Sequence, residues 1–182
     1  MSNDRPMRLH HHAVVVKDLK ATRNFYTGIL GLPMVALWSE VTADGQKYCH
    51  AFFELADGGC LAFFQFADEA DYQSYRRPDQ LSSFHHIALC GTKAYQDAVA
   101  KRAQDNQIIS QSHNHGYCHS FYAYDPDRHV VEITVDCDEP KVVQRIGEIQ
   151  ADPEAELERW IAGDHRVNND VRVELTQDRM KS

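Results

Sequence analysis

The chain has 182 residues, of which 43% are hydrophobic and 25% are charged. These values are typical of a folded globular protein and exclude a largely disordered chain. The net charge of −8 argues against nucleic-acid binding through a basic face. No apolar run reaches the ~20 residues of a membrane-spanning helix. The five cysteines form no CxxC pair and the first residues contain no apolar signal segment, so we expect a cytoplasmic protein.

The first half of the chain is predicted to contain one strand, one helix and three further strands. An apolar run at 13–16 predicts the first strand. Asp18 is a good N-cap for the helix that follows, and Gly31 and Pro33 end that helix. Two Asp-Gly turn signals separate the later strands, which we expect at 33–39, 47–55 and 60–66.

The second half repeats this pattern. The run His-His-Ile-Ala-Leu at 85–89 matches His-His-His-Ala-Val at 10–14 at three positions, and each copy opens a strand. Thr92 is the predicted cap of a helix that extends to about residue 104. The spacing of its apolar residues predicts an inner face of Ala94, Tyr95, Ala98, Val99 and Arg102. Further strands are expected at 108–112, 118–124 and 130–135.

These elements predict an α+β fold of two paired βαβββ modules, at about 8–67 and 84–136, that form a cupped mixed sheet. Neither module could bury its sheet face alone, so we expect one domain over 1–137. The polar segment 68–83 is the predicted linker. Residues 138–182 lie outside the repeat and form a C-terminal helical tail, with a helix at 154–162 capped by Asp152.

The repeat also organises the histidines. It places His11 and His86 at equivalent strand positions, each on the same face as the alanine two residues later. Glu132 is a carboxylate within an apolar strand, where burial without a partner is costly. Two imidazoles and a carboxylate suit a divalent metal ion.

Two alternatives stay open at this point. The histidines could be core residues bonded to the backbone, with Glu132 on an exposed strand face. A one-residue slip in strand register would also exchange each predicted ligand for a neighbour. Those neighbours are His10, His12 and His85.

With these residues in place, the chain resembles the vicinal oxygen chelate superfamily over about 8–136. That superfamily contains glyoxalase I, fosfomycin-resistance proteins, bleomycin-binding proteins and type I extradiol dioxygenases. The segment from His115 to Glu132 is similar to the more specific extradiol dioxygenase pattern. The residues that fall in place are Phe121, Tyr122, Asp125 and Pro126, whereas Arg128 stands where Gly or Pro is expected.

The resemblance implies a metal inside the cupped sheet. His11, His86 and Glu132 resemble the family's metal ligands, and Tyr122 and His115 resemble its active-site tyrosine and supporting histidine. Three protein ligands leave open positions on the ion, which suits Fe(II) with dioxygen. Mn(II) is a reasonable substitute, and Zn(II) or Ni(II) would suit an isomerase better.

Three features bear on the subtype. The fourth ligand of glyoxalase-type members falls at Ala62, which cannot bind metal, with Gln65 as the fallback. Ring-cleaving members often carry a basic histidine where this chain has Gly59, and the possible substitutes are His50, His113 and His119. Five aromatic residues either line a ligand pocket or fill the core: Phe52, Phe53, Phe63, Phe64 and Phe66.

The resemblance therefore implies a metal-dependent dioxygenase of the extradiol type that takes a catechol-like small aromatic and dioxygen as substrates. We expect a homodimer, with no nucleic-acid or membrane partner. One alternative is a glyoxalase- or fosfomycin-resistance-type metalloenzyme, which is an isomerase or transferase. The other is a small-molecule-binding protein without catalysis, because a fold does not fix a function.

Overall fold

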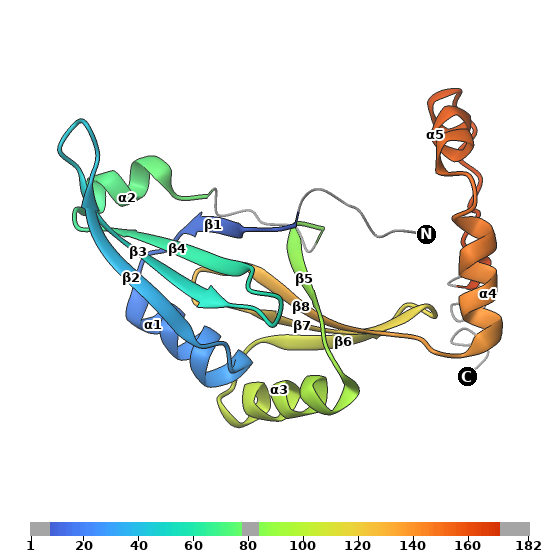
Figure 1. Ribbon diagram of the computed structural model, residues 1–182, viewed down its shortest axis with the longest axis horizontal. Coiled ribbons are helices and arrows are strands. Elements are labelled where there is room, and N and C mark those ends of the chain that lie inside the picture. Colours follow the sequence, from blue (N-terminus) through green and yellow to red (C-terminus); the bar gives the residue numbers. More distant parts are fainter. Residues whose placement is uncertain (1–7, 78–83, 172–182) are drawn as a thin grey trace.

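The computed structural model describes residues 8–77 and 84–171. Over these ranges the chain forms two βαβββ modules followed by a pair of helices, which confirms the predicted α+β architecture (Figure 1). The strands of the first sheet lie in the order β1 (His11–Val15), β4 (Cys60–Phe66), β3 (Lys47–Glu54) and β2 (Met34–Val41). Those of the second lie in the order β5 (His86–Cys90), β8 (Val130–Asp136), β7 (Cys118–Tyr124) and β6 (Ser110–Asn114). Each sheet is mixed, because its first strand pairs in parallel and its other strands pair antiparallel.

The first module follows the predicted order of elements. Its strands are β1 (His11–Val15), β2 (Met34–Val41), β3 (Lys47–Glu54) and β4 (Cys60–Phe66). Between β1 and β2, the helix α1 (Leu19–Arg23) continues into a π-helical segment η1 (Asn24–Leu30). The Asp18 carboxylate caps α1 by accepting hydrogen bonds from the backbone N–H groups of Lys20 and Ala21. Gly31 ends the segment with a φ of 84°, a left-handed conformation that glycine adopts without a steric penalty.

The second module repeats the first. It contains β5 (His86–Cys90), α3 (Lys93–Asp105), β6 (Ser110–Asn114), β7 (Cys118–Tyr124) and β8 (Val130–Asp136). Strand β6 begins two residues later than predicted. The reason is that the Ile108 N–H donates to the Ala103 carbonyl and so belongs to the end of α3.

The predicted inner face of α3 is partly wrong. Val99 is buried as expected, but Ala94 and Ala98 are exposed and Gln96 is buried. The Gln96 amide donates hydrogen bonds to the carbonyls of His119 and Ile133, at 2.8 and 2.7 Å. A polar side chain is tolerated there because these bonds satisfy it.

The segment predicted as a polar linker contains a helix, α2 (Glu69–Tyr75). Asp68 caps it by accepting a hydrogen bond from the Ala70 N–H, a signal present in the sequence that the linker interpretation overlooked. The rest of that segment, 78–83, lies outside the described residues.

The two modules share one core. Helices α1 and α3 lie on the same side of the two sheets in Figure 1, and buried side chains from both modules meet there. The Tyr26 hydroxyl donates to Asp125 Oδ2 at 3.1 Å, and Arg102 Nε donates to the Ile29 carbonyl at 2.6 Å. These bonds join residues 99 and 73 positions apart, so they fix one module against the other.

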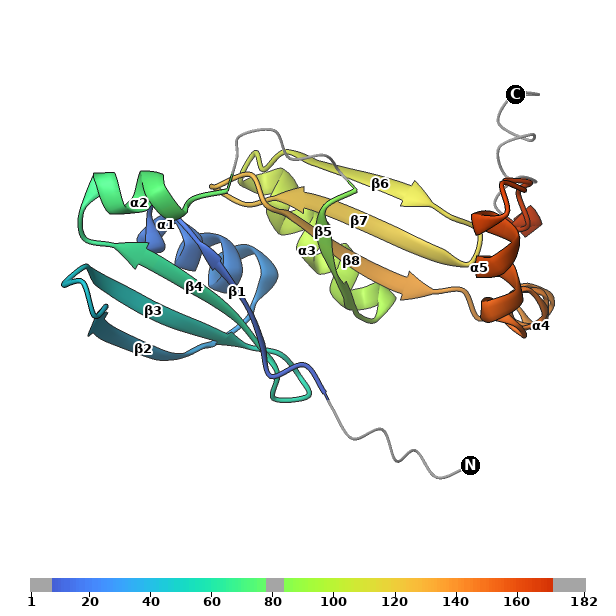
Figure 2. The same cartoon turned by 90° about the horizontal axis from the view of Figure 1, so that it is seen from above.

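The C-terminal tail is helical, as predicted. As far as residue 171, it contains α4 (Pro140–Ile149), which the sequence analysis did not predict, and α5 (Pro153–Ile161). Both helices stand beyond the end of β8, apart from the sheets, and neither contains a buried residue (Figures 1 and 2).

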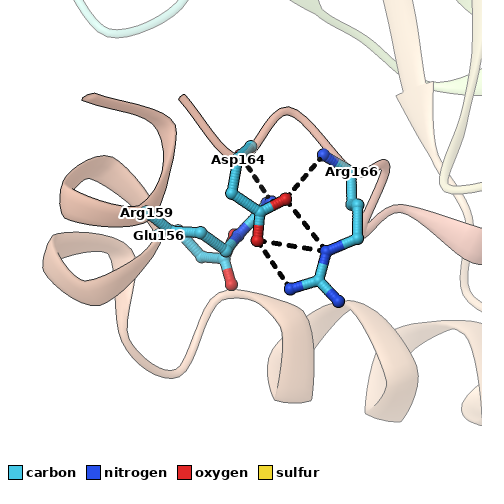
Figure 3. Close-up of polar contacts among 4 residues, drawn as sticks. All are labelled: Glu156, Arg159, Asp164 and Arg166. Atoms are coloured by element: carbon cyan, nitrogen blue, oxygen red, sulfur yellow. Dashed lines mark hydrogen bonds and ion pairs between the residues drawn. The ribbon is translucent and has the colours of Figure 1, made fainter. Parts of the chain in front are cut away.

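Asp164, in the loop after α5, forms ion pairs with Arg159 and Arg166 (Figure 3). The pKa of the Asp164 carboxyl lies below its usual range, mainly because Arg166 donates hydrogen bonds to it. In the described ranges, none of the helices has the length and apolar character needed to cross a bilayer.

Candidate metal and ligand site

Each sheet has one face turned away from α1 and α3, which we call its open face. Strand alternation places His11, Ala13, Trp38, His50, Phe52 and Phe64 on the open face of the first sheet. It places His86, Ala88, Tyr122 and Glu132 on the open face of the second sheet. Ala13 and Ala88 are exposed, so no other element of the described chain covers these positions.

On the second open face, the structure brings two predicted ligands together. Glu132 is only 6% exposed, and its Oε2 lies 2.9 Å from His86 Nε2. The Ser120 hydroxyl donates a hydrogen bond to Glu132 Oε1. These contacts satisfy the buried carboxylate and fix its orientation. Sequence reasoning missed Ser120, although its position two residues before Tyr122 on the same strand places both side chains on one face.

The predicted catalytic pair also meets on this face. His115 Nε2 and the Tyr122 hydroxyl are 3.0 Å apart, and the His113 ring lies beside Tyr122 with centroids 5.7 Å apart. Burial raises the pKa of the Tyr122 hydroxyl, and the negative charge of Glu132 adds to this effect. Tyr122 is therefore protonated at neutral pH and available as a hydrogen-bond donor.

The first open face carries His11 within an aromatic group. The His11 ring centroid lies 6.2 Å from that of His50 and 5.6 Å from that of Phe52. The Nδ1 atom of His11 lies 2.7 Å from the Nδ1 atom of His10, so one of these two nitrogens carries the proton of a hydrogen bond between them. The other ring nitrogen of His11, Nε2, is the atom that can bind a metal.

The adjacent histidines face elsewhere. His12 and His85 line a cavity of about 370 Å³ between the modules, together with Tyr26 and Phe63 from the core. His86 borders the same cavity from β5. In the observed register His12 points to the opposite side of β1 from His11, and His85 precedes the first residue of β5.

One chain gathers only part of the predicted metal set. His86 and Glu132 are in contact on the second sheet, while His11 lies on the first. Among residues 8–77 and 84–171, no three His, Cys, Asp or Glu side chains lie close enough together to hold a metal ion.

The structure also explains the two departures from the expected pattern. Ala62 lies on the first open face, in register with Ala13, whereas Gln65 faces the helix and its Oε1 accepts a hydrogen bond from the Leu19 N–H at 2.6 Å. Gln65 is thus committed to the start of α1. At Gly59, an added Cβ would lie 2.8 Å from the Leu9 carbonyl oxygen, so the backbone leaves no room for a histidine.

The possible substitutes for that histidine differ in placement. His119 lies on the opposite face of β7 from Ser120 and Tyr122, and therefore faces the α3 side of its sheet. His113 lies beside Tyr122, on the second open face. His50 is 9% exposed on the first open face, and its Nε2 is buried without a hydrogen-bond partner. Burial lowers the pKa of the His50 imidazole.

The five phenylalanines divide between the two roles considered. Phe53 and Phe63 belong to the shared core. The other three, Phe52, Phe64 and Phe66, alternate onto the first open face.

Comparison with known proteins gives a consistent family. A model of the Glyoxalase/Bleomycin resistance protein/Dioxygenase superfamily matches residues 8–133. The chain is similar to the fosfomycin resistance protein FosX from Listeria monocytogenes, with 21% identity, a TM-score of 0.52, and coverage of 72% of this chain and 95% of that one. A glyoxalase/dioxygenase from Nostoc punctiforme shows 25% identity, a TM-score of 0.52, and coverage of 76% and 97%. A glyoxylase/bleomycin resistance protein/dioxygenase domain from Frankia sp. EAN1pec shows 13% identity, a TM-score of 0.60, and coverage of 76% and 98%. No curated protein matches the chain significantly.

Proposed function

Because the chain belongs to the glyoxalase/bleomycin resistance protein/dioxygenase superfamily, we propose that it is a metal-dependent dioxygenase of the extradiol type that acts on a catechol-like small aromatic. The observation that carries this proposal is the grouping of His86, Glu132, Tyr122 and His115 on one open face. Members of this superfamily bind divalent metals, and FosX from Listeria monocytogenes has been solved with Mn(II).

The donor set fits a divalent ion. Glu132 and His86 present an oxygen and a nitrogen 2.9 Å apart, and both atoms are of the types that bind Fe(II) and Mn(II). His11 is the proposed third ligand. A bound ion would lower the pKa of a catechol hydroxyl and leave positions for the substrate and dioxygen.

The protein's own groups have separate tasks in this scheme. Ser120 holds the Glu132 carboxylate through its hydrogen bond. His115 Nε2 lies within hydrogen-bond distance of the Tyr122 oxygen and positions the tyrosine, whose hydroxyl can donate to a substrate oxygen. A donor aimed at an oxygen that gains negative charge stabilises that charge during reaction.

We propose that a homodimer completes the site. In this arrangement His11 of one copy lies against His86 and Glu132 of the second copy, because one chain alone keeps them on separate sheets. A twofold dimer would then contain two equivalent shared sites.

Mixing two inactive variants tests this arrangement. His11→Ala and Glu132→Ala are each expected to lose stoichiometric metal. If the site is shared, their mixed dimer regains one intact site from the unchanged halves, so an equal mixture recovers about a quarter of the wild-type metal content. If the three ligands come from one chain, the mixture binds no more metal than either variant.

The metal itself is tested by mass spectrometry on protein purified without chelators or a metal column. About one iron per chain, lost in Glu132→Ala, together with oxygen consumption by Fe(II)-loaded protein on a catechol panel, is the expected result. No oxygen consumption with any catechol would contradict the dioxygenase assignment.

A glyoxalase- or fosfomycin-resistance-type isomerase or transferase is the second candidate. The observation in its favour is that Gly59 has no room for the basic histidine that ring-cleaving members often carry. Bound Zn(II), Ni(II) or Mn(II) without oxygen consumption would support it. Failure to bind any metal after loading would instead indicate a small-molecule-binding protein.

A further inference from the structure

His50 presents an unusual polar atom on the first open face. Among the described residues, its Nε2 is the only buried side-chain nitrogen or oxygen without a hydrogen-bond partner. The ring stacks on Phe64, with centroids 3.9 Å apart and an interplanar angle of 23°, and lies 4.2 Å from the Phe52 centroid. The other ring nitrogen, Nδ1, is 4.0 Å from the Glu40 carboxylate.

A purely structural role does not account for this nitrogen. An unsatisfied buried nitrogen costs free energy, and a phenylalanine would stack on Phe64 without that cost. No side chain in the described part of the chain satisfies this nitrogen, so it is available to a bound ligand.

The surroundings identify the kind of partner. Trp38 is 52% exposed on the same face, with its ring centroid 4.7 Å from that of Phe52 and 5.9 Å from that of His50. An aromatic wall beside a polar atom is the arrangement that binds a flat ring with an oxygen substituent. The exposed His11 ring, 6.2 Å away between centroids, places this position next to the proposed metal ligand.

We propose that His50 is a ligand-binding residue that hydrogen-bonds through Nε2 to a hydroxyl oxygen of a small aromatic ligand, with the ligand ring against Trp38 and Phe52. This inference rests on the proposed function, because it takes the ligand of that same site to be a hydroxylated aromatic ring.

The test uses full-length protein loaded with Mn(II), with 4-nitrocatechol as the probe under anaerobic conditions. Its visible absorbance reports binding, and mass spectrometry reports metal content. His50→Phe keeps the ring stack and removes both nitrogens, and His50→Leu is a second variant of similar size to histidine. His119→Phe, an exposed histidine on the opposite face of the other sheet, is the matched control.

We expect His50→Phe to keep the wild-type metal content and a thermal midpoint at or above the wild-type value, while its Kd for 4-nitrocatechol rises about 10-fold or more. His119→Phe should bind the probe like the wild type. His50→Leu should show the same loss of affinity, so the inference stays testable if the phenylalanine variant fails to fold.

The possible failures are distinguishable. Wild-type affinity for the probe in both His50 variants would overturn the inference and leave the proposed function standing. Loss of metal in both variants would make His50 a metal ligand instead. Wild-type protein that binds Mn(II) but no 4-nitrocatechol would refute the aromatic ligand, and wild-type protein that binds no metal would refute the proposed function along with the inference.

Discussion

The hydrogen bond between Tyr26 and Asp125 joins the two modules, and removing it should lower the stability of the whole domain. Tyr26 is 2% exposed, and its hydroxyl lies 3.1 Å from Asp125 Oδ2. Burial, with the nearby Asp125 carboxylate, raises the pKa of the Tyr26 hydroxyl well above its ordinary value. It is therefore a donor across the working pH range.

The expected cost of Tyr26→Phe follows from what remains. A hydrogen bond to a charged group contributes about 1.5–3 kcal/mol. Asp125 keeps three other donors, namely the backbone N–H groups of Asp127 and His129 and the His129 ring. The carboxylate is not left unpaired, so we expect the lower end of that range, about 1.5 kcal/mol.

Urea unfolding followed by circular dichroism measures this effect. With an m value of about 2 kcal/mol/M, the midpoint should fall by about 0.75 M. Tyr75→Phe is the control, because Tyr75 is exposed and donates only to Gln46, so it should cost less than about 0.5 kcal/mol. Protein concentration must be held constant in case the chain dimerises. Equal midpoints for the two variants would refute the role of this bond in holding the modules together.

Three further predictions concern single positions. Gly59→Ala should lower the free energy of unfolding by about 1–3 kcal/mol, because the added Cβ would meet the Leu9 carbonyl oxygen. Gly28→Ala should raise it by about 0.5–1 kcal/mol, because Gly28 lies in a helical segment and its added Cβ would meet nothing within 4 Å. Urea midpoints of the two variants that move in the same direction would contradict this. Arg128 has a φ of 66°, so Arg128→Gly should raise the free energy of unfolding by about 1 kcal/mol, and a lower value would show that the turn is not strained. Burial raises the pKa of Asp127, so the folded state holds its proton more tightly than the unfolded state, and this group adds stability as pH falls through its folded-state pKa. Asp127→Asn should therefore be more stable relative to the wild type at pH 7 than at pH 4, and a pH-independent difference in unfolding midpoints would show that Asp127 is not responsible.

Local signals in the sequence were sufficient for most of the fold. Strands β4 and β7 match their predicted bounds because apolar runs end at clear turn residues. Asp18, Thr92 and Asp152 were recognised as caps because a side-chain acceptor beside free N–H groups is a local interaction. Helix α2 was missed because it is short and lies in a polar segment. Helix α4 was missed although Val142, Val143, Ile146 and Ile149 recur at helical spacing, a signal that was present in the sequence.

The sequence likewise predicts some features of the candidate site and leaves others to the structure. The internal repeat makes His11 and His86 equivalent strand positions, whereas the β7–β8 register that places Tyr122 and Glu132 on one face comes from the structure. The contact between His86 and Glu132, the hydrogen bond from Ser120 and the unpartnered nitrogen of His50 were not predictable. They depend on strand register and on side-chain burial.

The sequence by itself determined the two βαβββ modules, their equivalence and the residue types at the candidate site, because these follow from periodicity and short-range hydrogen bonding. Only the tertiary structure decided that Gly59 admits no side chain, that Gln65 faces the helix, and that one chain holds His11 apart from Glu132. Such facts depend on distances between residues remote in sequence. Those distances are set by strand pairing and helix packing within each module and by the placement of one module against the other, which no local pattern encodes.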